Sequence, residues 1–261
     1  MKAMLIMLGI AAICFCSLAS GAVVSEAVEY QAQGVSMKGY LAYDDAIKEK
    51  RPGVIVVHEW WGLNEYARRR ARMLAELGYT AFAIDMYGEG KNTVHPQEAG
   101  EFAAAVRNNM PAARARFNAA LDVIKKHETV IPDKIAAIGY CFGGGIVLQM
   151  ALDGAGLEGV VSFHGSLGGA YPENKPEVKA KILICHGADD PHVTAQQIEE
   201  FQRQLSKASA DWQMNIYSKA VHSFTNPEAG NDPSKGSAYN KEADVRSWEA
   251  MKLFLKEIFY D

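Results

Sequence analysis

The segment G-Y-C-F-G-G-G, from Gly139 to Gly145, restricts the possible folds of this chain more than any other segment. It follows the apolar run 134–139 and precedes the apolar segment 145–151. The pattern therefore predicts a buried strand, a tight turn and a helix. Glycines two residues before and two residues after Cys141 remove side chains that would clash in such a turn. This spacing is typical of a nucleophile elbow, with cysteine in place of serine.

The rest of the chain alternates apolar runs with amphipathic segments, and continuous apolar runs are expected of strands buried on both faces of a sheet. Strands are predicted at 35–43 (as an edge strand), 53–58, 80–85, 134–139, 159–164, 181–186 and 212–217. Helices are predicted at 63–77, 96–126 with a break near Pro111, from 145–151, and at 194–208 and 238–258. This alternation indicates an α/β fold, with a mostly parallel sheet covered by helices on both faces. Sites in such folds lie after the carboxyl ends of the strands.

The first 22 residues differ from the rest of the chain. Lys2 precedes a mostly apolar run that ends at Leu18, and small residues occupy 19–22. This is typical of a secretory signal peptide cleaved after the last of these small residues, and an uncleaved anchor is the alternative. The run is short for a membrane span, which needs about 20 apolar residues. We therefore expect residues 23–261 to form a single domain, periplasmic or secreted, without stable membrane association after cleavage.

Charge and cysteine content argue against several classes of function. The net charge is -4, whereas a general binder of nucleic-acid phosphates is usually basic. Two of the four cysteines lie in the leader, which leaves Cys141 and Cys185, and a disulfide between these two is one interpretation of an exported chain. Their spacing is unlike that of a zinc site, which needs clustered Cys and His. A redox protein is disfavoured because the chain lacks a C-x-x-C motif after the leader.

A cysteine nucleophile needs a histidine base, and the base needs an acid that orients it. With an elbow of this kind the chain order is nucleophile, acid, histidine. Of seven histidines, His222 is the one that follows the last predicted strand, while His192 lies too close to the candidate acids. The acid is expected after the strand 181–186, where Asp189 and Asp190 are candidates. Asp190 is favoured because it directly precedes a proline in the loop.

The second half of an oxyanion hole usually comes from the loop after an earlier strand. Here that loop reads H-E-W-W-G, from His58 to Gly62. We expect the backbone N–H groups of Trp60 and Phe142 to bind the developing oxyanion. Glu59 is an unusual neighbour, because its charge would oppose that oxyanion. A salt-bridged glutamate at the surface is the alternative.

Four segments together resemble the dienelactone hydrolase family of the α/β-hydrolase fold: H-E-x-x-G, G-Y-C-x-G-G, G-x-D-D-P and A-x-H-S-F, in this order. The resemblance covers about 35–258. It implies that Cys141, Asp190 and His222 form the catalytic triad. It also implies that Glu59 contacts the resting thiol until substrate displaces it.

Two positions depart from the pattern of that family. The arginines that bind the carboxylate of dienelactone would correspond to the region 101–103 and to Asn226, and neither is basic. Dienelactone itself is therefore not the expected substrate. Aromatic residues after the strands would suit a neutral, apolar or aromatic ester, and core packing is the alternative role for them. The expected substrate contacts are Trp61, Tyr87, His164 and Asn226.

The sequence thus predicts a hydrolase that cleaves a small ester or lactone, like a carboxymethylenebutenolidase, through an acyl thioester on Cys141. This chemistry needs no metal or organic cofactor. The chain has no long insertion that could form a large cap, which favours small substrates, and a monomer is expected. A carboxylesterase, thioesterase or peptide hydrolase of the same fold, and a non-catalytic exported binding protein, are the alternatives.

Overall fold

The structure of this protein is a computed structural model that describes residues 22–168 and 177–261. The predicted leader therefore lies outside the described residues, apart from Ala22. In the described part of the chain, no helix is both long enough and apolar enough to cross a membrane.

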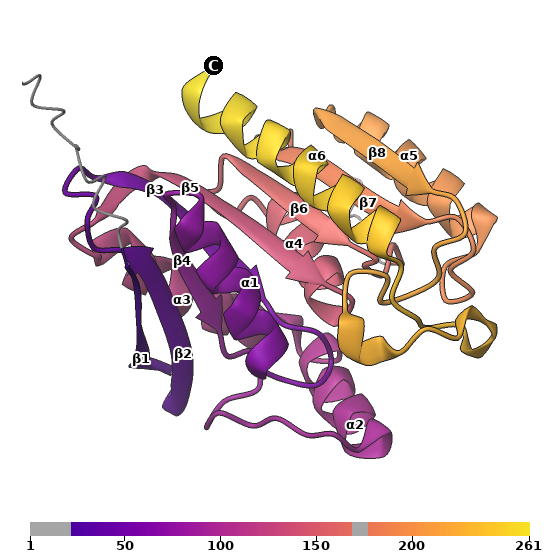
Figure 1. Cartoon of the computed structure of the whole chain (residues 1–261), viewed down its shortest axis with the longest axis horizontal. Coiled ribbons are helices and arrows are strands. Elements are labelled where there is room, and N and C mark those ends of the chain that lie inside the picture. Colours follow the sequence, from indigo (N-terminus) through magenta and orange to yellow (C-terminus); the bar gives the residue numbers. More distant parts are fainter. Residues whose placement is uncertain (1–21, 169–176) are drawn as a thin grey trace, which may run out of the picture.

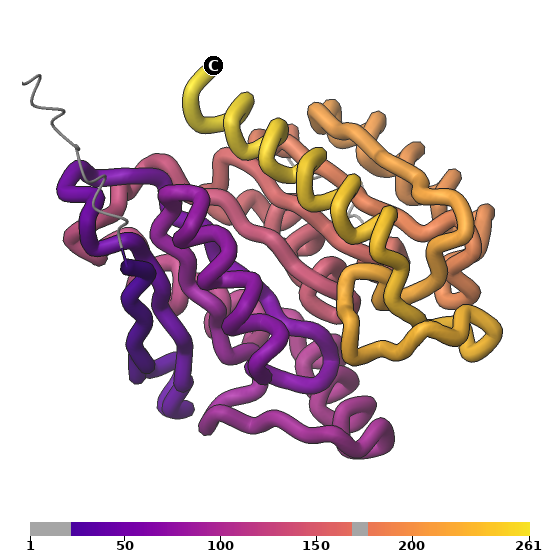
Figure 2. Tube along the Cα trace, viewed as in Figure 1, coloured from indigo at the N-terminus to yellow at the C-terminus, as the bar shows by residue number. Residues whose placement is uncertain are grey.

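An eight-stranded sheet runs through the middle of the molecule in the order β1-β2-β4-β3-β5-β6-β7-β8 (Figure 1). The first two strands form an antiparallel hairpin, β2 pairs antiparallel with β4, and all later neighbours pair in parallel. Figure 2 shows this hairpin at one end of the sheet and β8 at the other. The strands are β1 (Val23–Ala32), β2 (Val35–Asp44), β3 (Arg51–Val57), β4 (Thr80–Ile84), β5 (Val130–Tyr140), β6 (Gly159–Phe163), β7 (Lys181–Gly187) and β8 (Trp212–Tyr217).

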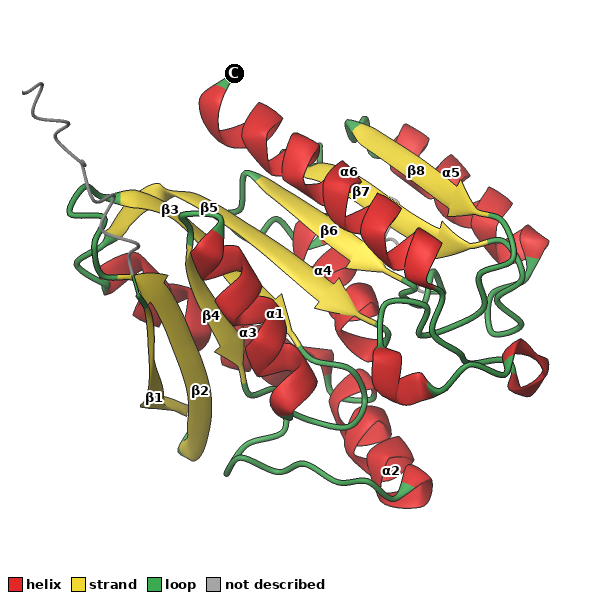
Figure 3. Cartoon of the chain, viewed as in Figure 1, coloured by secondary structure: helices red, strands yellow, loops and turns green. Residues whose placement is uncertain are grey.

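Helices cover both faces of this sheet (Figure 3). One apolar cluster packs α1 and α6 against one face, and a second packs α3, α4 and α5 against the other, with α2 beside α3. The helices are α1 (Glu65–Glu76), α2 (Pro96–Arg107), α3 (Met110–Lys126), α4 (Phe142–Leu152), α5 (Ala195–Lys207) and α6 (Lys241–Tyr260). The mostly parallel sheet with helices on both faces is the arrangement that the sequence pattern predicts, and the architecture is that of the α/β-hydrolase fold, as the resemblance implies.

The continuous apolar run in β3 shows why the central strands form where they do. Successive side chains in a strand point to opposite faces. Val54 and Val56 enter the cluster beneath α1 and α6, whereas Ile55 and Val57 enter the cluster beneath α3 and α4. All four are 0% exposed, so the strand is stabilised by burial on both faces.

Three of the differences between the structure and the predicted elements have a clear physical or local cause. Strand β1 was not predicted, because it is polar and half exposed, and its pairing with β2 makes the latter an inner strand rather than an edge strand. The helix break lies at 108–109, before Pro111, because Asn109 caps α3 and a proline fits the first turn of a helix. Helix α4 begins at Phe142, three residues earlier than Gly145, directly after the elbow.

Candidate active site

Cys141 occupies a sharp turn between β5 and α4. Its backbone angles are φ 53° and ψ -113°, which lie in the region that side chains rarely adopt. A Cβ atom at Gly139 would lie 2.1 Å from the carbonyl oxygen of Gly143, and one at Gly143 would lie 2.3 Å from the oxygen of Val57. Both positions therefore require glycine. The turn directs the Cys141 side chain away from the sheet and places it at the start of α4.

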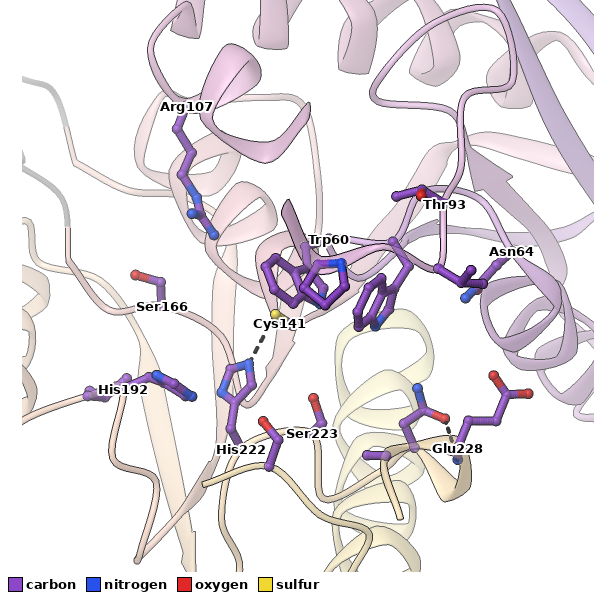
Figure 4. Close-up of a pocket in the computed structure, with 17 residues that line it drawn as sticks. Trp60, Asn64, Thr93, Arg107, Cys141, Ser166, His192, His222, Ser223 and Glu228 are labelled. Atoms are coloured by element: carbon purple, nitrogen blue, oxygen red, sulfur yellow. Dashed lines mark hydrogen bonds between the residues drawn. The ribbon is translucent and has the colours of Figure 1, made fainter. Parts of the chain in front are cut away.

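Three side chains that are far apart in the sequence meet at this turn. The Nε2 atom of His222 lies 3.0 Å from Cys141 Sγ (Figure 4). On its other side, His222 Nδ1 lies 2.8 Å from Asp190 Oδ2. Asp190 is 5% exposed, whereas the alternative acid, Asp189, is exposed to solvent. The carboxyl ends of β5, β7 and β8 thus bring together a thiol, an imidazole and a carboxylate in the order that acyl transfer requires.

The surroundings of His222 favour the charged form of its imidazole ring. Burial opposes the charge on His222, but the facing Cys141 sulfur and the Asp190 carboxylate outweigh it and raise the pKa of His222 to about 10. Burial would likewise raise the pKa of Asp190, but hydrogen bonds from His222 and from the backbone N–H of His192 hold it below its usual range. The site therefore favours a protonated imidazole beside the Cys141 sulfur.

Glu59 is buried rather than salt-bridged at the surface. It is 2% exposed, and burial raises the pKa of its carboxyl group. The carboxylate accepts hydrogen bonds from Asn226 Nδ2 at 2.7 Å and from Ser223 Oγ at 3.2 Å. The hydrogen bond of the Cys141 thiol is made with His222 instead. The contact between Glu59 and the resting thiol that the resemblance implies is thus not the arrangement of this structure.

The two expected oxyanion donors are the N–H of Phe142, which follows Cys141 in the chain, and the N–H of Trp60, a residue that lines the same cavity as Cys141. Phe142 is the first residue of α4, so its N–H lacks an acceptor within the helix. Within the described residues, neither this N–H nor that of Trp60 donates a hydrogen bond to another part of the protein. Both remain available to an oxygen that becomes negative beside the sulfur. The Phe142 side chain itself is 1% exposed and belongs to the core.

A cavity of about 790 Å³ opens above Cys141. Two tryptophans with ring centres 4.7 Å apart, Trp60 and Trp61, line it together, and Figure 4 shows Trp60 beside Cys141. The loop that carries His222 lines it as well. The lining residues are Trp60, Trp61, Asn64, Thr93, Val94, Pro96, Arg107, Cys141, Ser166, His192, Val193, His222, Ser223, Asn226, Glu228, Ala229 and Ser237.

Two of the four predicted substrate contacts line this cavity, and two do not. Trp61 and Asn226 do. The prediction was wrong for His164, which is 0% exposed and lies behind Cys141: its Nδ1 accepts a hydrogen bond from the backbone N–H of Cys141 at 3.1 Å. It was also wrong for Tyr87, which is 6% exposed and donates its hydroxyl proton to the backbone oxygen of Trp60 at 2.9 Å. Both residues follow strands, but each turns back into the protein.

The structure adds a cationic residue that the sequence did not single out. Arg107, the last residue of α2, lines the cavity, and its guanidinium lies 5.6 Å from the centre of the Phe142 ring. In the described part of the chain it has no ion-pair partner. Arg107 lies on the same helix as 101–103, the region where the resemblance places one of the carboxylate-binding arginines. In Figure 4 Arg107 and Glu228 lie at opposite ends of the cavity, with Cys141 between them.

The two cysteines that follow the leader are free thiols in this structure. Cys185 lies within β7 and is 0% exposed. In this structure no disulfide joins them.

Comparisons with known proteins agree with the fold of this chain. The profile of the dienelactone hydrolase family matches residues 37–259. A putative carboxymethylenebutenolidase of Saccharolobus solfataricus is 27% identical over 263 residues, covering 88% of this chain and 97% of that protein. The crystal structure of a dienelactone hydrolase-like promiscuous phosphotriesterase, P91 from metagenomic libraries, superimposes with a TM-score of 0.87 at 36% identity, covering 92% of this chain and all of that one. A structure named m3DLH has the same TM-score at 37% identity and equal coverage.

Proposed function

This chain is a hydrolase of the dienelactone hydrolase family, and from that premise we propose that it cleaves a small carboxylic ester or lactone with Cys141 as the nucleophile. One observation carries the proposal. His222 lies 3.0 Å from the Cys141 sulfur and 2.8 Å from Asp190, so base and orienting acid are already in line. A non-catalytic binding protein would have no use for this alignment.

The proposed reaction has two halves. His222 Nε2 accepts the thiol proton of Cys141, and the thiolate attacks the carbonyl carbon to form a C–S bond. The N–H groups of Trp60 and Phe142 hold the tetrahedral oxyanion until the C–O bond breaks, and His222 returns its proton to the leaving alkoxide. His222 then takes a proton from water, the hydroxide attacks the thioester, and the acid and the free thiol are released.

The cavity suggests which part of the substrate is recognised. The tryptophan pair supports an apolar or aromatic group, as the sequence predicts. Arg107 adds a positive charge that the sequence did not anticipate, and we propose that it binds an anionic or strongly polar group of the substrate. A lactone or ester that carries both an unsaturated apolar body and a carboxylate would occupy both features.

Hydrolysis of a small chromogenic ester, p-nitrophenyl acetate, tests the proposed function. The protein lacking residues 1–22 is assayed before and after alkylation with iodoacetamide. We expect activity before treatment and its loss in proportion to alkylation of Cys141, measured by mass spectrometry of the peptides. Full activity after complete alkylation of Cys141 would contradict the proposal.

A second candidate substrate class is the phosphotriester. The similarity to the P91 phosphotriesterase, at 36% identity over 92% of this chain, favours it. A thiolate that attacks phosphorus would form a P–S bond and expel an aryl oxide, and the same N–H groups would face the phosphoryl oxygen. Diethyl p-nitrophenyl phosphate releases the same chromophore as the ester, so the two reactions are compared directly. Turnover of the phosphate alone would assign the site to phosphotriesters.

We also propose that residues 1–22 direct export and that the mature protein, 23–261, acts as a monomer outside the cytoplasm. The apolar run after Lys2 and the small residues before Val23 support cleavage at this point. Expression of the full chain, followed by fractionation, N-terminal sequencing and light scattering, tests both statements. A cytoplasmic protein that retains its N-terminus would refute export.

A further inference from the structure

His58 lies directly behind the proposed oxyanion hole, outside the substrate cavity. It follows the last residue of β3 and is 0% exposed. Its ring stacks on the ring of Phe142 with an interplanar angle of 18° and a centroid distance of 5.7 Å. Tyr87 packs against it edge-on at 4.8 Å. His58 does not line the cavity, so it has no route to the substrate.

The hydrogen bonds of His58 define its protonation. The backbone N–H of Met86 donates to His58 Nε2 at 3.2 Å, so this nitrogen carries a lone pair. The proton of a neutral ring therefore resides on Nδ1, which lies 2.5 Å from the backbone oxygen of Glu59 and donates to it. Burial lowers the pKa of His58, which keeps the ring neutral. Both ring nitrogens are thus committed to backbone groups.

The Glu59 oxygen and the Trp60 N–H belong to the same peptide group. This group is planar and trans, so its C=O and N–H point in opposite directions. The hydrogen bond from His58 Nδ1–H to the Glu59 oxygen therefore also fixes the direction of the Trp60 N–H. A hydrogen bond to the C=O also polarises the N–H of the same unit, by about 10–30% in condensed-phase estimates. The N–H of Gly62 donates to the same oxygen at 3.3 Å, more weakly than His58.

The remaining contacts hold the same loop in place. The Tyr87 hydroxyl donates to the next carbonyl, that of Trp60, at 2.9 Å. The carboxylate of Asp85 accepts from the backbone N–H of Tyr87 at 2.9 Å, which fixes the segment that also supplies Met86. His58 thus contacts the peptide of one oxyanion donor and the side chain of the residue that carries the other, Phe142.

We propose that His58 is a positioning residue that presets the oxyanion hole, by holding the Glu59–Trp60 peptide through its Nδ1–H and by packing on Phe142. This inference rests on the proposed function, because it concerns an oxyanion formed by attack of Cys141. His58 acts through the backbone and never touches the substrate. His58 therefore accelerates only reactions that form an oxyanion.

Two substitutions separate the two nitrogens of the ring. In H58N, the side-chain amide can place an N–H where Nδ1 lies, so the donor to the Glu59 oxygen is kept. In H58Q, the amide reaches the position of Nε2, so the acceptor for Met86 is kept and the donor is lost. H127Q is the matched control, because His127 bonds to Thr129 at the end of α3, away from the cavity.

Each variant is assayed for hydrolysis of p-nitrophenyl acetate and for the rate of Cys141 alkylation by iodoacetamide. Alkylation displaces iodide at a saturated carbon, so it needs the thiolate but no oxyanion hole. We expect H58Q to lower kcat about 100-fold, the effect of losing one oxyanion donor, with little change in KM and in the alkylation rate. H58N should retain hydrolysis within about tenfold, and H127Q should match the wild type.

A loss of hydrolysis in H58N as large as that in H58Q would overturn the proposal, as would a parallel fall of hydrolysis and alkylation. If H58Q fails to fold in a thermal unfolding scan, H58N decides: retained hydrolysis supports the proposal, and a 100-fold loss with normal alkylation contradicts it. The C141A variant reports separately on the proposed function. Normal hydrolysis by C141A would refute the nucleophile, whatever His58 does.

Discussion

The two free cysteines lie only two strands apart in one sheet, and their surroundings are opposite. Cys141 follows the carboxyl end of β5, half buried, with His222 Nε2 3.0 Å from its sulfur. Cys185 lies inside β7, 0% exposed, and burial raises the pKa of its thiol to about 12 although the Tyr217 hydroxyl donates to the sulfur. The position relative to the end of the strand therefore decides which thiol contacts a histidine and lines a cavity. Only where the chain leaves the sheet do a helix start, a base and a cavity converge on the sulfur.

The largest expected effect tests the contrast between Cys141 and Cys185 directly. C141A should lower hydrolysis by at least about 10³-fold, because the remaining oxyanion donors and the cavity give only residual catalysis. C185A should leave hydrolysis nearly unchanged and lower the unfolding free energy by about 1 kcal/mol, because it removes one buried sulfur atom. Ester assays and urea unfolding of both variants are the measurements. A similar loss of activity in the two variants would contradict the assignment.

The next effect concerns Asp190, the carboxylate that contacts His222 beside Cys141. D190N should lower kcat by about 10²–10⁴-fold, because an amide no longer fixes His222 in the tautomer and orientation that accept the thiol proton. D189N is the matched control, since that side chain is exposed to solvent one residue away. Steady-state kinetics of both variants provide the test. Equal activity of D190N and D189N would remove Asp190 from the triad.

A smaller effect tests the positive charge of Arg107 in the cavity above Cys141. Cys185 has no such cavity beside it in the described part of the chain. R107M should raise KM about tenfold for an ester that carries a carboxylate and change it little for a neutral ester of the same size, because one charge-assisted hydrogen bond is lost. R203M, on the exposed face of α5, serves as control. For each variant, the ratio of its KM to the wild-type KM is measured for the charged ester and for the neutral ester, and the two ratios are compared. Equal ratios for both esters would show that Arg107 does not read substrate charge.

The smallest effect is a pH dependence of stability at the same site. The pKa of His222 is raised from an ordinary value of 6.5 to about 10 in the folded state. Protonated His222 therefore stabilises the folded state fully below about pH 6.5. This contribution to the unfolding free energy is lost as the pH rises towards 10. The difference in unfolding free energy between the wild type and H222Q should shrink over this range. Urea unfolding at intervals of one pH unit measures it, and a constant or growing difference would contradict the raised pKa.

Much of the fold could be predicted because it depends on local patterns. The run 53–58 is apolar at every position from Val54 to Val57, and a strand buried on both faces needs nothing else. Strand β1 escaped prediction because most of its residues are exposed or half-buried and two of them, Glu26 and Glu29, are charged, and its stability comes from pairing with β2. Pairing partners of this kind lie outside any local window of sequence.

The sequence by itself determined the sharp turn at Cys141 and the candidates Asp190 and His222, because glycine spacing and loop composition act over a few neighbouring residues. The tertiary structure decided which other side chains face the cavity. It turned Tyr87 and His164 inward to support the backbone, and it brought Arg107 to the site from the end of a helix. The physical reason is that the direction of a side chain after a strand depends on which buried partners satisfy its polar atoms, and those partners come from distant parts of the chain.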